Sequence, residues 1–317
     1  MSKGAWPTSV AVVGAGTMGV GIAHVFAAHA VPTALVDASP ELSEGARARA
    51  VELLARLEAA GSIGAGATAT AERNLTAASS IPDAVAGADL ILEAVFERPD
   101  VKAAAYAEIE TAAAADAVIA TNTSSIPIAQ LADTLKHPGR FLGVHWFVPP
   151  LLVPCVEVIP IGSTDPPVVK RVVSALTALG KTAVVVGDGP GFVANRIQFA
   201  MFREAARIVE DGVATPEQVD EIVRSSFGFR LPFFGPFTIA DMAGLDVYAD
   251  IFDTLERGLG EGFAAPALLR DHVARGEYGV KAGRGFLDLS QEQARELIER
   301  RDRAYVALAR LRAEGEE

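Results

Sequence analysis

Apolar runs of strand length alternate with segments of helical periodicity through the first part of the chain. The run Ser9–Val13 ends at a glycine, and apolar residues spaced by four over 18–26 then predict a strand, a turn and a helix. A second apolar run over 32–36 ends at Asp37, and Ser39 with the proline after it supplies a helix cap and a first-turn proline. This pattern predicts a βαβ unit.

The alternation continues beyond this unit and predicts a Rossmann-type α/β domain. The segment 61–70 is rich in Gly, Ala and Thr and is expected to be a loop. Strands that alternate with helices form a mostly parallel, doubly wound sheet. Helices are expected near 99–114, 126–135 and 165–179, and strands at 90–95, 117–121, 141–144, 156–159 and 181–186.

Three glycines around one proline, in Gly187–Gly191, end this pattern. No convincing strand follows, whereas 192–213 has helical spacing. We therefore expect an α/β domain over residues 1–188 and a smaller all-helical domain over residues 189–317.

Two further features belong to the expected helical domain. The tail 291–312 has opposite charges at i,i+4 spacing and an apolar stripe, and we expect an amphipathic helix there. The phenylalanines of 227–237 are dense enough to form a helical core, a dimer face or the wall of a substrate pocket, and a core or dimer face is favoured.

Composition and charge narrow the class of protein. The chain has 317 residues, of which 50% are hydrophobic and 21% charged, and is long enough for two globular domains. Its net charge of −12 disfavours binding to nucleic acids or anionic membranes. We expect no membrane span, and the apolar stretch 10–28 is interpreted as part of the βαβ unit and not as a signal peptide. A single cysteine, Cys155, excludes an internal disulfide and a cysteine-based metal cluster, so we expect no metal site and a cytoplasmic location.

The segment between Gly14 and Gly19 reads G-A-G-T-M-G and matches the pattern G-x-G-x-x-G. It follows a predicted strand and opens a predicted helix, which is the context that a dinucleotide-binding site requires. In that context Gly14 allows the tight turn, Gly16 lets the backbone approach a pyrophosphate, and Gly19 lets the helix pack closely on the strand. A glycine-rich turn that serves only to reverse the chain is the alternative.

The residues around this turn favour NAD as the cofactor. Thr17 and Met18 lie at the expected amino terminus of the helix, where free N–H groups and the helix dipole attract phosphates. Asp37 is placed to accept hydrogen bonds from the diol of an adenine ribose and to repel a 2′-phosphate, and no arginine follows it directly. NAD is therefore favoured over NADP, and FAD, which uses the same pattern, stays possible.

A histidine and a glutamate on neighbouring strands are candidates for catalysis. His145 is expected just after the strand 141–144, at the carboxyl edge of the sheet where a bound nicotinamide would lie. Glu157 follows on the next strand, and a histidine held by a carboxylate has a fixed tautomer, which suits a general base. The spacing does not show that the two side chains touch. A buried structural histidine is an equally good interpretation of the local sequence.

Several motifs in order make the chain resemble the 3-hydroxyacyl-CoA dehydrogenase family over about 9–289. They are the Gly14–Gly19 turn, Glu93–Glu97 with Lys102, Thr121–Ser125, His145 with Glu157, Gly189–Arg196, Gly235-Pro236, Gly244–Asp246 and Gly283–Phe286.

The resemblance implies roles for individual residues. Without it, Ser124 would be interpreted as a helix cap and Asn195 as a polar residue in a first helical turn. The family's catalytic serine, base, orienting acid and substrate-binding asparagine correspond to Ser124, His145, Glu157 and Asn195. Its cofactor-binding residues correspond to Gly14, Gly16 and Gly19, with Thr17 and Met18 in the same turn, and to Asp37, Glu97, Lys102 and Asn122.

The resemblance also implies an activity. Members of the family oxidise a secondary 3-hydroxyl group to a ketone, reversibly, by hydride transfer to NAD+ in fatty acid metabolism, and they do so as homodimers. For this chain that implies a small hydroxyacyl or hydroxy-acid substrate and a helical domain that serves substrate binding and dimerisation.

Departures from the family pattern leave the substrate open. Val148 stands where the family usually has an asparagine, and the segment between Arg56 and Arg73 contains no lysine for the phosphates of coenzyme A. A small free hydroxy acid or a carboxylated ring alcohol is therefore an alternative to a CoA thioester. A second alternative is a non-catalytic protein that binds a dinucleotide and has kept the fold.

Overall fold

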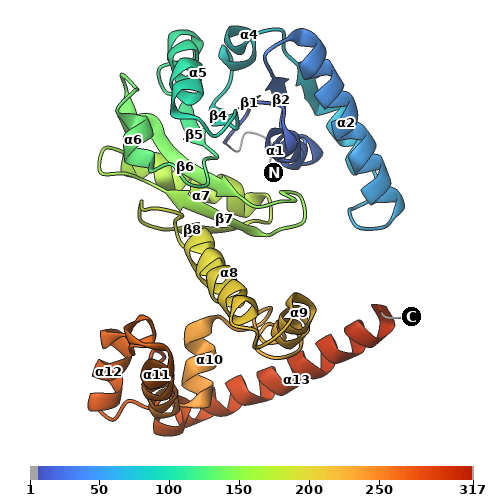
Figure 1. Ribbon diagram of the computed structural model, residues 1–317. Coiled ribbons are helices and arrows are strands. Elements are labelled where there is room, and N and C mark those ends of the chain that lie inside the picture. Colours follow the sequence, from blue (N-terminus) through green and yellow to red (C-terminus); the bar gives the residue numbers. More distant parts are fainter. Residues whose placement is uncertain (1–5, 316–317) are drawn as a thin grey trace. The chain divides into compact units, whose positions relative to one another are not determined.

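The computed structural model describes residues 6–315, which form two structural units (Figure 1). The first unit ends at Met201 and the second begins at Phe202. Within the part of the chain that is described, the first unit contains a single eight-stranded sheet and the second is built from helices. The predicted fold class, a Rossmann-type α/β fold followed by a smaller helical region, is confirmed.

The sheet has the strand order β3-β2-β1-β4-β5-β6-β7-β8. All neighbouring strands are parallel except β6 and β7, which pair in antiparallel orientation. The central strands are buried at every position, as expected for a sheet that is covered on both faces. The bounds of the eight strands are β1 Val10–Val13, β2 Thr33–Val36, β3 Leu75–Ala77, β4 Leu90–Glu93, β5 Val118–Thr121, β6 Phe141–Trp146, β7 Cys155–Ile159 and β8 Thr182–Val185.

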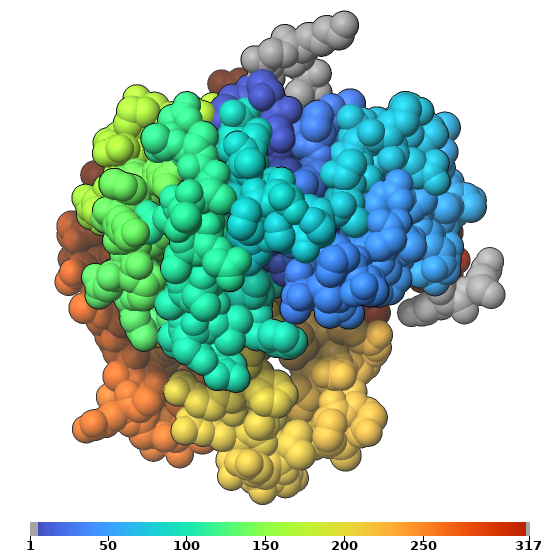
Figure 2. Space-filling view, turned by 90° about the horizontal axis from the view of Figure 1, so that it is seen from above, coloured from blue at the N-terminus to red at the C-terminus, as the bar shows by residue number. Residues whose placement is uncertain are grey.

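Helices cover both faces of this sheet and bury separate hydrophobic clusters. On one face Val10 and Val12 pack with α1 (Thr17–Ala28), α2 (Pro40–Ala59), α3 (Ala67–Asn74) and α7 (Pro166–Ala178). On the other face Ala11 and Val13 pack with α4 (Ile81–Val85), α5 (Pro99–Ala112) and α6 (Ile128–Ala132). Figure 2 shows the teal segment that carries α4 and α5 packed beside the green segment that carries α6. The carboxyl ends of the central strands therefore open onto one edge between two layers of helices.

The structure differs from the expected elements in several places. Strand β3 was not predicted, because Leu75–Ala77 is too short for a period to be recognised. The expected loop at 61–70 ends at Gly66, whose positive φ of 84° precedes helix α3. Strand β6 extends to Trp146, so His145 lies within the strand and not just after it.

The second unit packs around a small core of its own. Helix α8 (Ala194–Glu210) begins in the first unit and continues into the second. Ala240, Leu245, Ala249 and Leu269 form the buried cluster. The other helices are α9 Pro216–Ser225, α10 Pro236–Ala243, α11 Leu245–Leu259, α12 Ala267–Ala274 and α13 Gln291–Gly315, with 3-10 turns at Pro138–Arg140 in the first unit and at Glu261–Phe263 and Val280–Ala282 in the second.

The expected amphipathic tail is the helix α13, and it contacts the phenylalanines. The ring of Tyr305 on α13 lies 5.6 Å from that of Phe229, 6.4 Å from that of Phe233 and 6.3 Å from that of Phe234, measured between ring centroids. Phe234 is buried, whereas Phe227 is exposed. Most of this aromatic cluster is therefore packing within the second unit. Among the described residues, none of the helices has the length and apolarity needed to cross a bilayer.

Candidate active site

Two of the three glycines in the turn after β1, Gly14 and Gly19, are required by their surroundings in the protein. Gly14 has a φ of +102°, and a Cβ there would lie 2.5 Å from the carbonyl oxygen of Ala94. A Cβ at Gly19 would lie 1.7 Å from the carbonyl oxygen of Gly14, because helix and strand pack backbone to backbone. Gly16 is different, since a Cβ there would meet nothing within 4 Å. Open space at Gly16 is what close approach of a pyrophosphate needs.

The amino terminus of α1 is free to bind an anion. Gly16 is its N-cap residue and provides no side chain to cap the helix, and the first turn carries no acidic residue. Gly16 and Thr17 are exposed, and Met18 is half-buried. Asp37 lies beside this turn, with Oδ2 accepting a hydrogen bond of 2.7 Å from the backbone N–H of Ala15. The acid expected to bind the ribose is therefore fixed to the phosphate-binding turn, and the turn fits a dinucleotide.

A fully buried carboxylate at the end of β4 fixes Lys102. Glu93 is 0% exposed, and its two oxygens accept hydrogen bonds from Lys102 Nζ (2.7 Å), Tyr106 Oη (2.7 Å), Thr121 Oγ1 (2.7 Å) and the Val95 N–H (2.8 Å). Burial, followed by the charge of Glu93, raises the pKa of Tyr106 and keeps its hydroxyl a donor. In the sequence Glu93 stands out only as part of a motif, and the four donors around it leave no sequence signal.

Lys102 in turn holds Glu97, which organises the loop that contains Ser124. Lys102 Nζ lies 3.3 Å from Glu97 Oε2. Glu97 Oε1 accepts hydrogen bonds from Thr123 Oγ1 (2.5 Å) and from the N–H groups of Ser124 (2.9 Å) and Ser125 (3.1 Å). Burial raises the pKa of Glu97, but these hydrogen bonds and the charge of Lys102 outweigh it and hold the pKa below its usual value. The loop is therefore anchored by an ionised carboxylate.

His145 and Glu157 face each other across β6 and β7. The two residues are directly paired in the antiparallel register, and His145 Nδ1 lies 2.8 Å from Glu157 Oε2. His145 is 4% exposed and Glu157 is 3% exposed. Because a carboxylate only accepts, Nδ1 carries the proton and Nε2 is left with its lone pair. The contact that the sequence could not establish is present, and its geometry suits a general base at Nε2.

Glu157 also joins this pair to the amino terminus of α8. Its second oxygen, Oε1, accepts hydrogen bonds from the N–H groups of Val193 (3.1 Å) and Ala194 (3.0 Å). Asn195 follows directly, and its Nδ2 donates to the carbonyl oxygen of Ser124 at 3.1 Å. The structure therefore places the four predicted catalytic residues in two contacting pairs, and the start of α8 connects the pairs.

Two other residues singled out in the sequence have structural contacts of their own. Asn122 Oδ1 accepts a hydrogen bond of 2.9 Å from the N–H of Trp146, which ties the end of β5 to β6. Burial, followed by the charge of Glu157, raises the pKa of the Cys155 thiol. A thiol with a raised pKa is a poor nucleophile, so the structure gives Cys155 no catalytic role.

Comparison with known proteins decides the family. Residues 9–189 match the NAD binding domain of 3-hydroxyacyl-CoA dehydrogenases, and residues 191–289 match the C-terminal domain of the same enzymes. The chain belongs to this family. The predicted resemblance is confirmed, and so is NAD as the cofactor.

Relatives in the family carry two kinds of name. The chain is 34% identical over 310 residues to 5-formyl-3-hydroxy-2-methylpyridine 4-carboxylate 5-dehydrogenase of Mesorhizobium japonicum, covering 98% of this chain and 99% of the relative. It is also 34% identical over 284 residues to a probable 3-hydroxybutyryl-CoA dehydrogenase of Bacillus subtilis, covering 89% and 98%. The crystal structure of a 3-hydroxyacyl-CoA dehydrogenase from Archaeoglobus fulgidus superposes with a TM-score of 0.78 at 32% identity, covering 95% and 99%. Family and cofactor together make this chain an NAD-dependent dehydrogenase that acts on CH–OH groups.

Proposed function

We propose that this dehydrogenase oxidises the secondary 3-hydroxyl group of a small hydroxyacyl substrate to a ketone, reversibly, with His145 as the base. The observation that carries the proposal is the buried contact of 2.8 Å between His145 Nδ1 and Glu157, which leaves Nε2 as a proton acceptor. NAD+, when bound, accepts the hydride from the carbon that bears the hydroxyl group. His145 Nε2 takes the hydroxyl proton as the carbonyl bond forms, and Glu157 stabilises the imidazolium.

Other residues would bind and orient the reacting groups. The turn Gly14–Gly19 with Asp37 would hold the dinucleotide phosphates and the adenine ribose, and Glu97 with Lys102 would position the loop beside the nicotinamide. Ser124 and Asn195 would donate hydrogen bonds to the reacting oxygen or to a neighbouring carbonyl. A donor of this kind typically contributes about 100- to 1,000-fold in rate.

The substrate class has two candidates. A CoA thioester agrees with the family and with the names of most relatives. A free hydroxy acid or a carboxylated ring alcohol is supported by the apolar Val148 in the loop after the base and by the relative that acts on a pyridine carboxylate.

We propose further that the functional domains are residues 1–188 and 189–317, that the helical domain forms a homodimer, and that the enzyme is cytoplasmic. The domain boundary is supported by the family matches, which meet between residues 189 and 191. A single cysteine supports the location. The dimer is supported by large apolar side chains exposed along α8, namely Ile197, Phe199, Met201 and Phe202. Sedimentation analysis would test the dimer, and a monomer at micromolar concentration would contradict it.

A turnover assay with paired substrates tests the proposed reaction. The protein is incubated with NAD+ and one of three substrates, and NADH formation is followed. The substrates are 3-hydroxybutyryl-CoA, free 3-hydroxybutyrate, and the alcohol that results when the formyl group of 5-formyl-3-hydroxy-2-methylpyridine 4-carboxylate is reduced. We expect turnover of at least one substrate class, with NADP+ a much poorer acceptor because of Asp37. Binding of NADH without turnover of any of them would support the non-catalytic alternative instead.

A further inference from the structure

The segment 188–195 lies between β8 and the first turn of α8, and of its side chains the proposed reaction uses only Asn195. Asp188 fixes the start of the segment, because its two carboxylate oxygens accept hydrogen bonds of 3.0 and 2.9 Å from N–H groups at the start of α6. At the other end Asn195 donates to the carbonyl oxygen of Ser124. The segment is therefore anchored on both sides of Phe192.

Phe192 has a backbone conformation that phenylalanine rarely adopts. Its φ is +49°, in the left-handed region, and the φ of Gly191 before it is +71°. Within residues 6–315 the other non-glycine residue with a positive φ is Ala30, which follows the end of α1, where this conformation is common. Phe192 lies instead just before a helix begins. A bulky residue in this region is strained, and such strain is concentrated at functional sites, where the surrounding structure maintains it.

The phenyl ring of Phe192 lies against the proposed base. Its centroid is 5.5 Å from that of the His145 imidazole, and the two ring planes are inclined by 53°, which is a usual geometry for a pair of aromatic rings. Phe192 is 5% exposed and belongs to the hydrophobic cluster on the face of the sheet that α4, α5 and α6 cover. The ring is therefore part of the core of the first unit and also part of the surroundings of the base.

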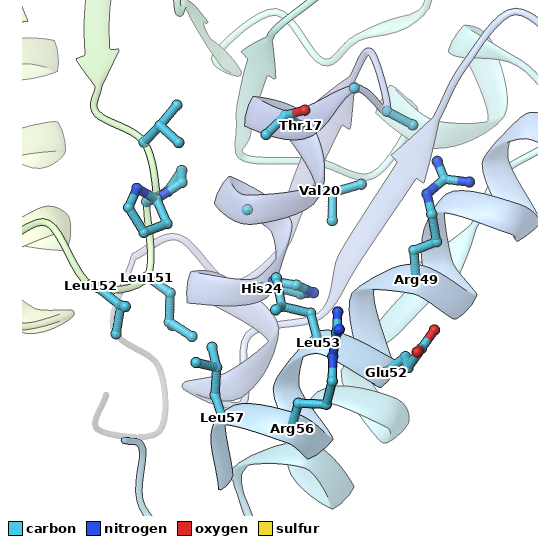
Figure 3. A pocket seen from close by; sticks show the side chains of 16 residues that line it. Thr17, Val20, His24, Arg49, Glu52, Leu53, Arg56, Leu57, Leu151 and Leu152 are labelled. Atoms are coloured by element: carbon cyan, nitrogen blue, oxygen red, sulfur yellow. The ribbon is translucent and has the colours of Figure 1, made fainter. Parts of the chain in front are cut away.

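A second phenyl ring contacts the same imidazole. Phe147 follows β6 directly, and its ring centroid is 4.6 Å from that of His145. It begins the loop whose Leu151 and Leu152 line a cavity with residues of α1 and α2 (Figure 3). Phe147 is two residues from the base along the chain, whereas Phe192 comes from a distant segment. The contact made by Phe192 therefore depends on how that segment is held.

The two residues after Phe192 contact the other member of the catalytic pair. The N–H groups of Val193 and Ala194 donate to Glu157 Oε1, while Glu157 Oε2 contacts His145. Since φ is the rotation about the N–Cα bond, the φ of Phe192 sets the direction of its ring and of both N–H groups relative to the anchored residues before it. The contacts with the imidazole and with the carboxylate therefore both depend on the strained conformation.

Building on the proposed function, we propose that Phe192 is a positioning residue for the base. Its ring keeps the imidazole in the orientation in which Nδ1 faces Glu157 and Nε2 faces the hydroxyl group of the substrate. Its left-handed backbone directs the two following N–H groups at Glu157. A glycine would adopt this backbone without strain, but it has no ring to support the imidazole.

Three substitutions separate the ring from the strain. Phe192→Ala removes the ring and keeps the strain, Phe192→Gly removes both, and Phe192→Leu keeps apolar volume beside the imidazole. Leu131→Ala removes a buried side chain of α6 from the same hydrophobic cluster and is the control for lost packing. Each full-length variant is compared with the wild type by thermal unfolding, by NADH titration and by steady-state kinetics well below its thermal midpoint, with a substrate that the wild type turns over.

We expect Phe192→Gly to unfold at a higher temperature than Phe192→Ala, because glycine adopts a positive φ freely. Both variants should nevertheless lose kcat about tenfold or more, since the base is no longer held in position. KM and NADH affinity should change little, and Phe192→Leu should recover most of kcat. A residue that served packing alone would behave like Leu131→Ala, with a lower thermal midpoint and a kcat near that of the wild type.

NMR of protein labelled with 15N-histidine follows the base without turnover. The signals of His145 are those that the variant His145→Gln lacks. At alkaline pH we expect the wild type to show one protonated and one unprotonated ring nitrogen. In Phe192→Ala the two nitrogen signals should shift toward each other, because the ring leaves Glu157 for part of the time and both tautomers form.

The two measurements distinguish this proposal from the proposed reaction. Unchanged imidazole signals in Phe192→Ala overturn the proposal, and so does a kcat equal to that of Leu131→Ala if His145→Gln is inactive. Shifted signals together with undiminished turnover in His145→Gln would leave the positioning role intact and contradict the proposed base alone. Loss of turnover in His145→Gln with unchanged signals in Phe192→Ala would do the reverse.

Discussion

Glu157 has two roles that use different oxygens. Oε2 contacts the Nδ1 atom of His145, and Oε1 accepts the N–H groups of Val193 and Ala194 at the start of α8. The proposed base is therefore oriented by the same group that fixes the helix leading into Asn195. A substitution that keeps one role and removes the other separates orientation of the base from stability of the fold.

Glu157→Gln is such a substitution. The amide oxygen of glutamine still accepts from the helix N–H groups, which leaves the NH₂ group facing His145 Nδ1 and forces the ring proton to Nε2. The ring then cannot accept the hydroxyl proton. We expect kcat to fall at least about 100-fold while the thermal midpoint changes little. Steady-state kinetics and thermal unfolding check this. Cys155→Ala, two residues away on the same strand, is the control, and a similar kcat in both variants would contradict the assigned role of Glu157.

The pKa of His24 makes stability depend on pH. Its folded value of about 4 lies below the unfolded value of 6.5, so the unfolded chain binds more protons between these values and stability is lost as the pH falls through this range. From pH 7.5 to pH 5 this group should lower the free energy of unfolding by about 2 kcal/mol. Urea unfolding at both pH values should show a smaller decrease in His24→Gln. Equal decreases in the two proteins would contradict a neutral buried ring.

At the scale of elements, the periodicity of hydrophobic residues and the spacing of glycines predicted most of the helices and strands of the first unit. The strand-turn-helix at 10–28 and the position of Asp37 after β2 follow from local patterns, so this part of the structure was predictable. The contact between His145 and Glu157 was not, because it depends on β7 running antiparallel to β6, and apolar runs of this length carry no sign of strand direction. The same limit applies to Lys102, whose burial follows from contacts with Glu93 that are set by the fold.

The loop after β6 is held by a lysine that the sequence does not distinguish from an ordinary strand residue. Lys181 is 8% exposed, and its Nζ donates to the carbonyl oxygens of Pro150 (2.5 Å), Leu151 (3.3 Å) and Val153 (3.0 Å). Burial lowers the pKa of this lysine. Three carbonyl groups of the loop, one of them buried, therefore take hydrogen bonds from one ammonium group.

Lys181→Met should loosen this loop. Leaving the three carbonyl groups without a donor should lower the free energy of unfolding by about 2–4 kcal/mol. The loop lines a cavity together with Gly16 and Thr17 of the phosphate-binding turn, so KM should rise more than kcat falls. Chemical unfolding and steady-state kinetics measure the two effects, with Lys170→Met as the control for loss of an exposed lysine. A stable variant with an unchanged KM would show that the ammonium group does not order the loop.

At the scale of the whole molecule, the proposed catalytic and NAD-binding residues all lie in the first unit. The match to the family's C-terminal domain ends at residue 289, yet the second unit continues with the 25-residue helix α13. Tyr305 on this helix contacts the rings of Phe229, Phe233 and Phe234. The helix is therefore part of the packing of the second unit and not an appended tail.

Tyr305→Ala should destabilise the second unit without affecting NADH binding. Removing a half-buried aromatic ring from this cluster should cost about 1–3 kcal/mol. Calorimetric unfolding together with a fluorescence titration of NADH separates the two properties, and Val306→Ala, an exposed neighbour, is the control. Weaker NADH binding in Tyr305→Ala would contradict the assignment of the cofactor site to the first unit alone.

The substitution His145→Gln tests the proposed base most directly. Glutamine at this position cannot take a proton at neutral pH, while the phosphate-binding turn and Asp37 stay unchanged. Turnover of the wild-type substrate and NADH affinity should be measured side by side in the two proteins. We predict a loss of turnover of at least about 100-fold with almost unchanged NADH affinity. Undiminished turnover would show that another group removes the proton, and the proposed mechanism would be wrong.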